Sequence, residues 1–210
     1  MRIGELSRRT GVSVPTIKFY VREGLLPAGE LTSPNQASYG EAHVQRLRLI
    51  RALLDVGGMS IAEIRCVIEA IDDPDRPVHE VLGTAASRMV PRYEREPGAG
   101  IEEARRKVDE LITARGWHTV PSNLASEALA TALAALDEVG HGAFIEVLDV
   151  YADAAELVAR ADLDYVARNV AREELVESTV VGTVLGDAIF SALRRMAHVD
   201  ASDRLFGEAK

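Results

Sequence analysis

The stretch "GVSVPTIKFYVREGLLP", residues 11–27, decides the fold of the first part of the chain. Ser13 is suited to cap a helix, Pro15 is tolerated in its first turn, and Gly24 is expected to end it. Just before this stretch, Ile3 and Leu6 are three residues apart in a short helical pattern that stops at Gly11. Two short helices joined by a tight turn with a glycine predict a helix-turn-helix.

The second of these helices has one apolar and one mixed face. At about 100° per residue, a buried stripe is predicted for Val14, Ile17 and Val21, and the opposite face carries Thr16, Phe19, Tyr20 and Glu23, flanked by Lys18 and Arg22. Such a face can donate to phosphates and reach base edges from the major groove. The alternative for the two adjacent aromatic residues is that they pack under a neighbouring loop.

The elements that follow extend this pattern. Residues 27–40 are rich in Pro, Gly, Ser and Asn and hold two short extended pieces, which predicts a loop or a two-stranded wing. Residues 41–58 have helical spacing and end in a Gly-Gly pair, and residues 60–71 begin with a capping box formed by Ser60 and Glu63. The predicted order is helix, turn, helix, wing, helix, helix.

Charge is unevenly distributed along the chain. The net charge is −9, which by itself argues against a nucleic-acid partner. Through residue 71, however, nine basic side chains stand against seven acidic ones, a net charge of +2, which leaves −11 for the rest. This asymmetry suggests a head that faces nucleic acid and a separate acidic body.

Residues 1–71 strongly resemble the DNA-binding domain of MerR-family transcriptional regulators. The resemblance rests on "MRIGELSRRTGVSVPTIKFYVREGLLP", a wing containing Tyr39, and "VQRLRLIRALLDVGGMSIAEIRCVI". It implies a winged helix-turn-helix that binds pseudo-palindromic promoter DNA as a homodimer and distorts the promoter so that RNA polymerase can engage it. It also implies DNA contacts from the second helix, the wing and the third helix.

The expected DNA-binding residues follow from this match and from the mixed face described above. They are Val14, Thr16, Lys18, Phe19, Tyr20 and Arg22 in the second helix, Tyr39 in the wing and Arg46 in the third helix. Two departures stand out. Lys18 replaces an arginine that is usual in the family and lacks its bidentate fork, and Gln36-Ala37 replaces a common Tyr-Arg pair in the wing. Weaker or differently specified binding is therefore expected.

The acidic body is expected to be helical, which gives an all-α chain apart from the small wing. Domain boundaries are predicted at 1–72 for the head, 73–100 for a linker with a short helix at 78–90, and 101–210 for a dimerisation and effector domain. The long dimerisation helix usual in the family is interrupted by "PRYEREPGAG". Residues 172–198 are apolar on nearly all sides, which predicts burial on most sides, and Gly182 and Gly186 are candidates for close helix packing within one subunit or across a dimer.

The body loosely resembles the effector domain of TetR-type regulators. That resemblance implies a cavity for a small-molecule effector. Its candidate lining is Trp117, Phe144, Tyr151, Tyr165 and Phe190, with Glu146 or Asp149 available to meet a cation. Spacing alone favours ordinary core packing for these aromatic residues.

Several classes of function find no support in the sequence. Signature motifs of hydrolases, metalloproteases, phosphate loops and dinucleotide sites are absent, so no enzyme activity and no cofactor are expected. The five histidines lack metal-pair spacing, and the single Cys66 excludes a disulfide framework. No signal peptide or membrane span is expected, since the apolar stretch 178–193 is short and contains Asp187.

The favoured hypothesis is a cytoplasmic, nucleoid-associated transcriptional regulator. Its expected partners are double-stranded promoter DNA, RNA polymerase, a second copy of the chain and a small-molecule effector. Two alternatives stay open: an architectural DNA-binding protein similar to the excisionases, and a regulator whose body binds a protein partner.

Overall fold

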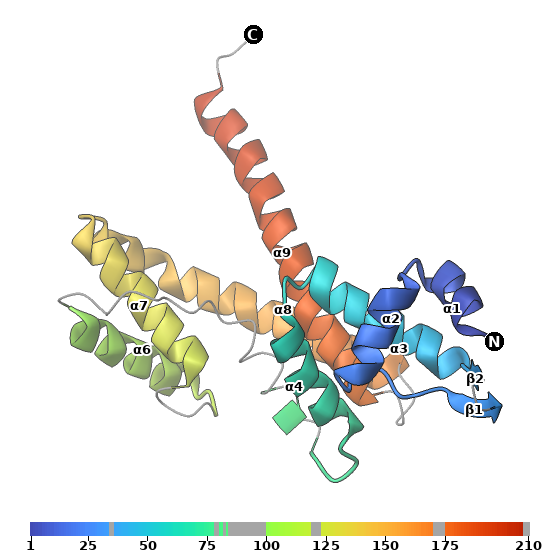
Figure 1. Ribbon diagram of the computed structural model, residues 1–210. Coiled ribbons are helices and arrows are strands. Elements are labelled where there is room, and N and C mark those ends of the chain that lie inside the picture. Colours follow the sequence, from blue (N-terminus) through green and yellow to red (C-terminus); the bar gives the residue numbers. More distant parts are fainter. Residues whose placement is uncertain are drawn as a thin grey trace. The chain divides into compact units, whose positions relative to one another are not determined.

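The computed structural model describes residues 1–33, 36–77, 80, 81, 83, 100–118, 123–169 and 175–207. Its described elements are helical except for one small sheet, which confirms the predicted fold class (Figure 1). In chain order they are α1 (Ile3–Thr10), α2 (Val14–Arg22), β1 (Glu30–Ser33), β2 (Gln36–Ser38), α3 (Glu41–Asp55), α4 (Ile61–Asp72), α6 (Ile101–Arg115), α7 (Leu124–Glu138), the 3₁₀ helix η1 (Gly142–Val147), α8 (Leu148–Asn169) and α9 (Leu175–Phe206).

The chain divides into two compact units. The first comprises residues 1–88 together with 166–210, and the second comprises residues 89–165. This differs from the boundaries expected from sequence, because α9 groups with the head and not with the rest of the body. The physical reason is a close contact: a Cβ added to Gly57, just after α3, would lie 2.4 Å from Cγ1 of Val184 in α9.

The core of the first unit is built by apolar residues of α1, α3 and α4 and of the turn after α2. Fully buried side chains include Leu6, Leu25, Leu26, Leu47, Ile50, Leu53, Ile64 and Val67. The local signals in the sequence account for the helix ends. The Ser13 hydroxyl accepts from the N–H of Thr16 at 3.2 Å, and Ser60 and Glu63 form the expected capping box.

The wing is a two-stranded antiparallel sheet. Glu30 pairs with Ser38 and Leu31 with Ala37, and the register shifts between Leu31 and Ser33. All described residues of β1 are exposed. The wing is therefore an open hairpin on the surface of the head, as the sequence predicts.

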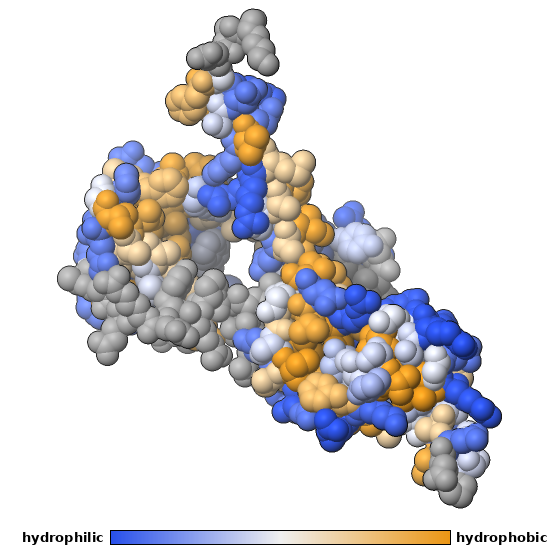
Figure 2. All heavy atoms as spheres, turned by 45° about the horizontal axis from the view of Figure 1, so that its top comes forward, coloured by the Kyte–Doolittle hydropathy of each residue, from blue (hydrophilic) through white to orange (hydrophobic). Residues whose placement is uncertain are grey.

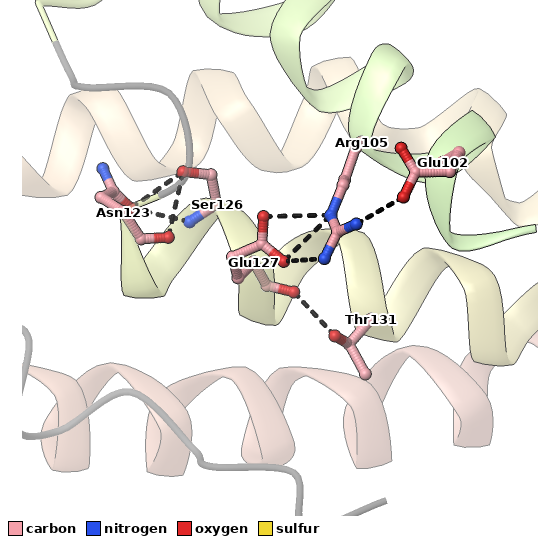
Figure 3. Close-up of polar contacts among 6 residues, drawn as sticks. All are labelled: Glu102, Arg105, Asn123, Ser126, Glu127 and Thr131. Carbon is pink, nitrogen blue, oxygen red and sulfur yellow. Dashed lines mark hydrogen bonds and ion pairs between the residues drawn. The ribbon is translucent and has the colours of Figure 1, made fainter. Parts of the chain in front are cut away.

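The second unit has a thin core between α6 and α7. Ala104, Val108, Ala130 and Ala134 are its buried residues. A polar clasp on Arg105 holds the two helices together: its Nε and Nη2 donate to Glu127 at 3.1 and 2.8 Å, and Nη1 donates to Glu102 at 2.6 Å (Figure 3). Asn123 caps α7 by accepting from the N–H of Ser126.

Two expectations for the body meet different outcomes. The short helix expected at 78–90 lies largely outside the described residues, although 80, 81 and 83 are helical and Val81 is buried. The expected burial of residues 172–198 on most sides is wrong for the second half of α9. Val180 and Val184 are buried, whereas Ile189, Leu193 and Met196 are exposed. No helix among the described residues is long and apolar enough to cross a membrane.

Candidate nucleic-acid interface

The turn between α1 and α2 is fixed by local hydrogen bonds. Gly11 adopts a left-handed conformation with φ 71°, and its N–H donates to the Ser7 carbonyl oxygen at 2.9 Å. The hydroxyls of Ser13 and Thr16 lie 2.7 Å apart at the start of α2. The turn thus holds the beginning of α2 in one orientation, which a recognition helix requires.

Helix α2 presents a mixed face, but Tyr20 is not part of it. Lys18 and Arg22 are exposed, and Thr16 and Phe19 are half-buried. Tyr20 is only 4% exposed, so the prediction that it lies on the outer face is wrong. It follows Ile17 by three residues, and the large ring joins Ile17 on the core side of the helix, where Val14 and Val21 are only half-buried.

Burial changes the chemistry of the Tyr20 hydroxyl. Desolvation raises its pKa above the ordinary value, the charge of Asp55 adds to the shift, and Arg51 opposes it. Tyr20 is therefore a packing residue of the head that stays protonated near neutral pH.

Phe19 stays at the surface next to a cation. The guanidinium carbon of Arg22 lies 5.5 Å from the centroid of its ring, which is within the range of a cation–π contact. This contact holds Arg22 over the helix, where it offers donors to a phosphate. The aromatic pair in the sequence therefore divides its work: Phe19 supports an exposed arginine, and Tyr20 fills the core.

Tyr39, the wing residue expected to contact DNA, is only 9% exposed. Its ring packs on the backbone of Gly29, where an added Cβ would lie 3.0 Å from ring atoms, and it meets the ring of His43 edge-on at 5.2 Å. Its N–H donates to the Met1 carbonyl oxygen at 2.9 Å, and the Met1 amino group donates to its carbonyl oxygen at 2.7 Å. Tyr39 thus anchors the base of the wing to the start of the chain.

Ion pairs divide the nine basic residues of the head into two groups. Four of them pair with acidic groups: Arg9 with Glu41, Arg46 with Asp72, Arg51 with Asp55, and Arg65 with Glu23. The other five are exposed and have no acidic partner among the described residues; they are Arg2, Arg8, Lys18, Arg22 and Arg48. These five, here called the unpaired cations, are the groups most available to phosphates.

Arg46 therefore has a different environment from the one expected. Its side chain is 16% exposed and bonds Asp72 at the end of α4, and its Nη1 is buried without a hydrogen-bond partner in the described part of the chain. Its role as a phosphate contact remains a prediction. Arg8 and Arg48 were not singled out from the sequence, although Arg48 lies only two positions after Arg46 and so faces away from it.

The acidic face of α8 is occupied by groups of the same chain. Arg115 bonds Asp153 and Asp149, which raises the pKa of its guanidinium, and the Trp117 indole donates to Glu156 at 2.8 Å. The cation that Asp149 was expected to meet is thus Arg115. Within the described residues no group of three or more metal-ligating side chains is found.

The five aromatic residues expected to line an effector cavity do not do so in the described structure. The Phe144 and Tyr151 rings lie 5.9 Å apart and are exposed, as are Tyr165 and Phe190. A described cavity between α6, α7 and η1 has a volume of about 40 Å³ and is lined by other residues, among them Lys107, Leu133 and Ile145. It has room for a few water molecules at most.

Comparisons with known proteins identify the head. The family described as "MerR HTH family regulatory protein" matches residues 1–71. A heavy metal-dependent transcription regulator of Rhizobium meliloti (strain 1021) is 31% identical over 111 residues, which are 53% of this chain and 74% of that protein. The chain belongs to the MerR family.

Other relatives of this MerR-family chain differ in how much of it they match. The nodulation protein NolA of Bradyrhizobium elkanii is 46% identical over 68 residues, and the match spans 31% of that protein and 32% of this chain. The structure of SCO5550, described as a transcriptional regulator of Streptomyces coelicolor A3(2), covers 100% of both chains with 34% identity and a TM-score of 0.75. The MerR head and the helical body therefore occur together in another bacterial protein.

Proposed function

We propose that this MerR-family chain is a transcriptional regulator that binds pseudo-palindromic promoter DNA as a homodimer. The observation that carries the proposal is the exposed pair Lys18 and Arg22 on α2, which belong to the unpaired cations of a head whose other cations are neutralised by acidic partners. Cations without internal partners supply most of the affinity for a phosphate backbone.

In this proposal α2 enters the major groove and the wing lies over the adjacent backbone. Lys18 reaches a base edge or phosphate as a point charge, Arg22 contacts a phosphate from above Phe19, and Thr16 donates from the first turn. Two heads related by a two-fold axis would bind two half-sites and distort the DNA between them, so that RNA polymerase engages both promoter elements.

Control of the regulator is assigned to the helical body. A small-molecule effector is one candidate, and a protein partner is the other. The small volume of the cavity between α6, α7 and η1 favours the protein partner, because effector pockets are commonly about 300 Å³ or larger. An architectural role similar to that of the excisionases is less favoured, since bending DNA needs no body of this size.

The same proposal places the protein in the cytoplasm in association with the nucleoid, without enzymatic activity. DNA and RNA polymerase are there, and the proposed role needs no chemical step. Binding and promoter geometry account for it entirely.

Titration of the purified protein against its own upstream DNA at several salt concentrations tests the proposal. Arg22→Ala is expected to weaken binding on all sequences and to lower the slope of log K against log salt by about one. Lys18→Ala is expected to weaken binding and to change the preference at particular base pairs. Arg106→Ala removes a cation from the second unit and serves as the control. Unchanged binding in both head variants would contradict the proposed surface.

A further inference from the structure

Helix α9 has two halves in different environments. In the first half Val180 and Val184 are buried, and Val184 lies against Gly57 of the head. In the second half the large apolar side chains are exposed: Ile189, Phe190, Leu193, Met196, Val199, Leu205 and Phe206. Apolar surface is visible along this projecting part of the helix (Figure 2).

The exposed apolar residues follow a heptad pattern. Steps of four and three residues connect Gly182, Gly186, Ile189, Leu193, Met196, Asp200 and Asp203, which we call the α9 seam. Ile189, Leu193 and Met196 at its centre are 60%, 56% and 69% exposed. This spacing is the one that lets two helices pair along their length.

The exposed surface is larger than a monomer commonly leaves uncovered. The seam and its apolar neighbours exceed the few hundred Å² typical of the largest patches on monomers and approach the ~800 Å² per partner of a standard interface. Pairing over residues 182–204 would align about 33 Å of helix at about 1.5 Å per residue. A second copy of α9 offers a matching length of apolar surface.

We propose that the α9 seam pairs with the α9 seam of a second copy, antiparallel, about a two-fold axis at Leu193. This rests on the proposed function, which requires a dimer, and it names the element that forms one. A two-fold axis makes the interface self-complementary, with residue i opposite residue j in both directions. Leu193 meets its equivalent, and Ile189 lies opposite Met196 of the partner.

The acidic residues of the seam determine the direction of pairing. In a parallel pair in register, Asp200 and Asp203 would each face the same carboxylate of the second copy, which is unfavourable at a helix interface. In the antiparallel pair Asp200 lies opposite Gly186, and Asp203 lies opposite Gly182. The glycines have no side chain to cover the carboxylates, and an added Cβ on Gly182 would meet nothing within 4 Å in one chain.

The pairing would connect directly to the DNA-binding heads. The first half of the same helix packs beside α3 at Gly57, and both belong to the first unit. A dimer held by α9 would therefore fix the distance between two recognition helices without a flexible connection. That distance must match the spacing of the two half-sites.

The oligomeric state of the full chain without DNA tests the pairing. The wild-type protein is expected to sediment at twice the 22.8 kDa mass of the chain. The double variant Leu193→Arg/Met196→Arg is expected to sediment as a monomer, and because both side chains are exposed the fold should persist. Leu205→Arg, an exposed leucine on the opposite side of the same helix, is the matched control and should stay dimeric. A monomeric wild type, or a dimeric seam variant, would overturn the proposal.

Disulfide trapping tests the direction. In a Cys66→Ser background, Leu193→Cys is expected to form a cross-linked dimer on oxidation, and Asp203→Cys is not. Cross-linking by both variants would show a parallel pair and reject the antiparallel arrangement. Neither variant cross-linking would reject the axis at Leu193.

Failure of this proposal can be distinguished from failure of the proposed function. The monomeric seam variant is expected to keep weak binding to a single half-site with an unchanged salt dependence per half-site. DNA binding by a wild type whose dimer survives the seam substitutions would reject the α9 pairing alone. A wild-type dimer that depends on the seam but ignores DNA would reject the regulator and leave the pairing intact.

Discussion

At the scale of single residues, the partners of each cation decide which of them can serve DNA. Arg46 has the sequence position of a DNA contact, yet its guanidinium is largely enclosed and bonded to Asp72. Lys18 and Arg22 have fewer obligations within the chain, since they are exposed on α2. Identity of residue type therefore does not establish a phosphate contact, and internal pairing has to be considered with it.

Arg46→Ala is expected to lower stability and to leave the salt dependence of DNA binding unchanged. The substitution removes the ion pair and the packing of the arginine stem, at a cost of about 1–2 kcal/mol, whereas Asp72→Asn costs about 0.5–1 kcal/mol because that carboxylate is half exposed. Urea unfolding and salt titrations of both variants check this. A lower salt slope in Arg46→Ala with normal stability would instead restore Arg46 as a phosphate contact.

Tyr20 gives the head a stability that depends on alkaline pH. Its pKa is raised by burial, so the folded state holds the phenolic proton more tightly than the unfolded state. The resulting stability is fully present below the unfolded pKa of about 10 and is lost as pH rises through the raised folded value. Tyr20→Phe is therefore expected to unfold less steeply between about pH 9 and 11 in thermal scans. A variant with the wild-type pH profile would show that Tyr20 does not carry this dependence.

At the scale of elements, the base of the wing is held by a close fit. Tyr39 packs on Gly29, and an added Cβ there would lie 2.8 Å from the Ser38 carbonyl oxygen. Contacts under 3.0 Å to backbone force a shift, so the wing can keep its position only with glycine at this point. The wing is thus positioned by packing at its base, and the chain needs no further bond at its exposed strands to place it.

Gly29→Ala is expected to displace Tyr39 and the wing, with a loss of about 1–2 kcal/mol in stability and a larger relative loss in DNA affinity. Gly40→Ala is the matched control, since a Cβ at Gly40 meets nothing within 4 Å and φ is −99°. Denaturant unfolding and DNA titration of both variants provide the comparison. Equal behaviour of the two alanine variants would mean that the close fit does not position the wing.

The elements of the head could be predicted because their signals are local. Ser13, Gly11 and the Ser60–Glu63 box act within a few residues, and each ends or begins a helix where expected. The side of α2 on which Tyr20 lies, and the partner of Arg46, depend on contacts between elements distant in sequence. Those contacts are decided by packing of the whole head, which periodicity along one helix does not contain.

At the scale of the whole molecule, α9 joins the end of the chain to its beginning. Its apolar composition predicts burial, but composition cannot say whether the covering surface lies in the same chain, and its second half is exposed here. A helix that packs on the head and then offers a seam to a second copy would make dimerisation and DNA reading one mechanical unit. The body between them would then act by changing how this unit is held.

The measurement that tests the central claim most directly is footprinting of the purified full-length chain on the DNA upstream of its own gene, at two salt concentrations. The account predicts a protected pseudo-palindrome with two half-sites, distorted base pairs between them and weaker protection at the higher salt. Protection of a single site without two-fold symmetry, or no specific protection at either salt concentration, would contradict it.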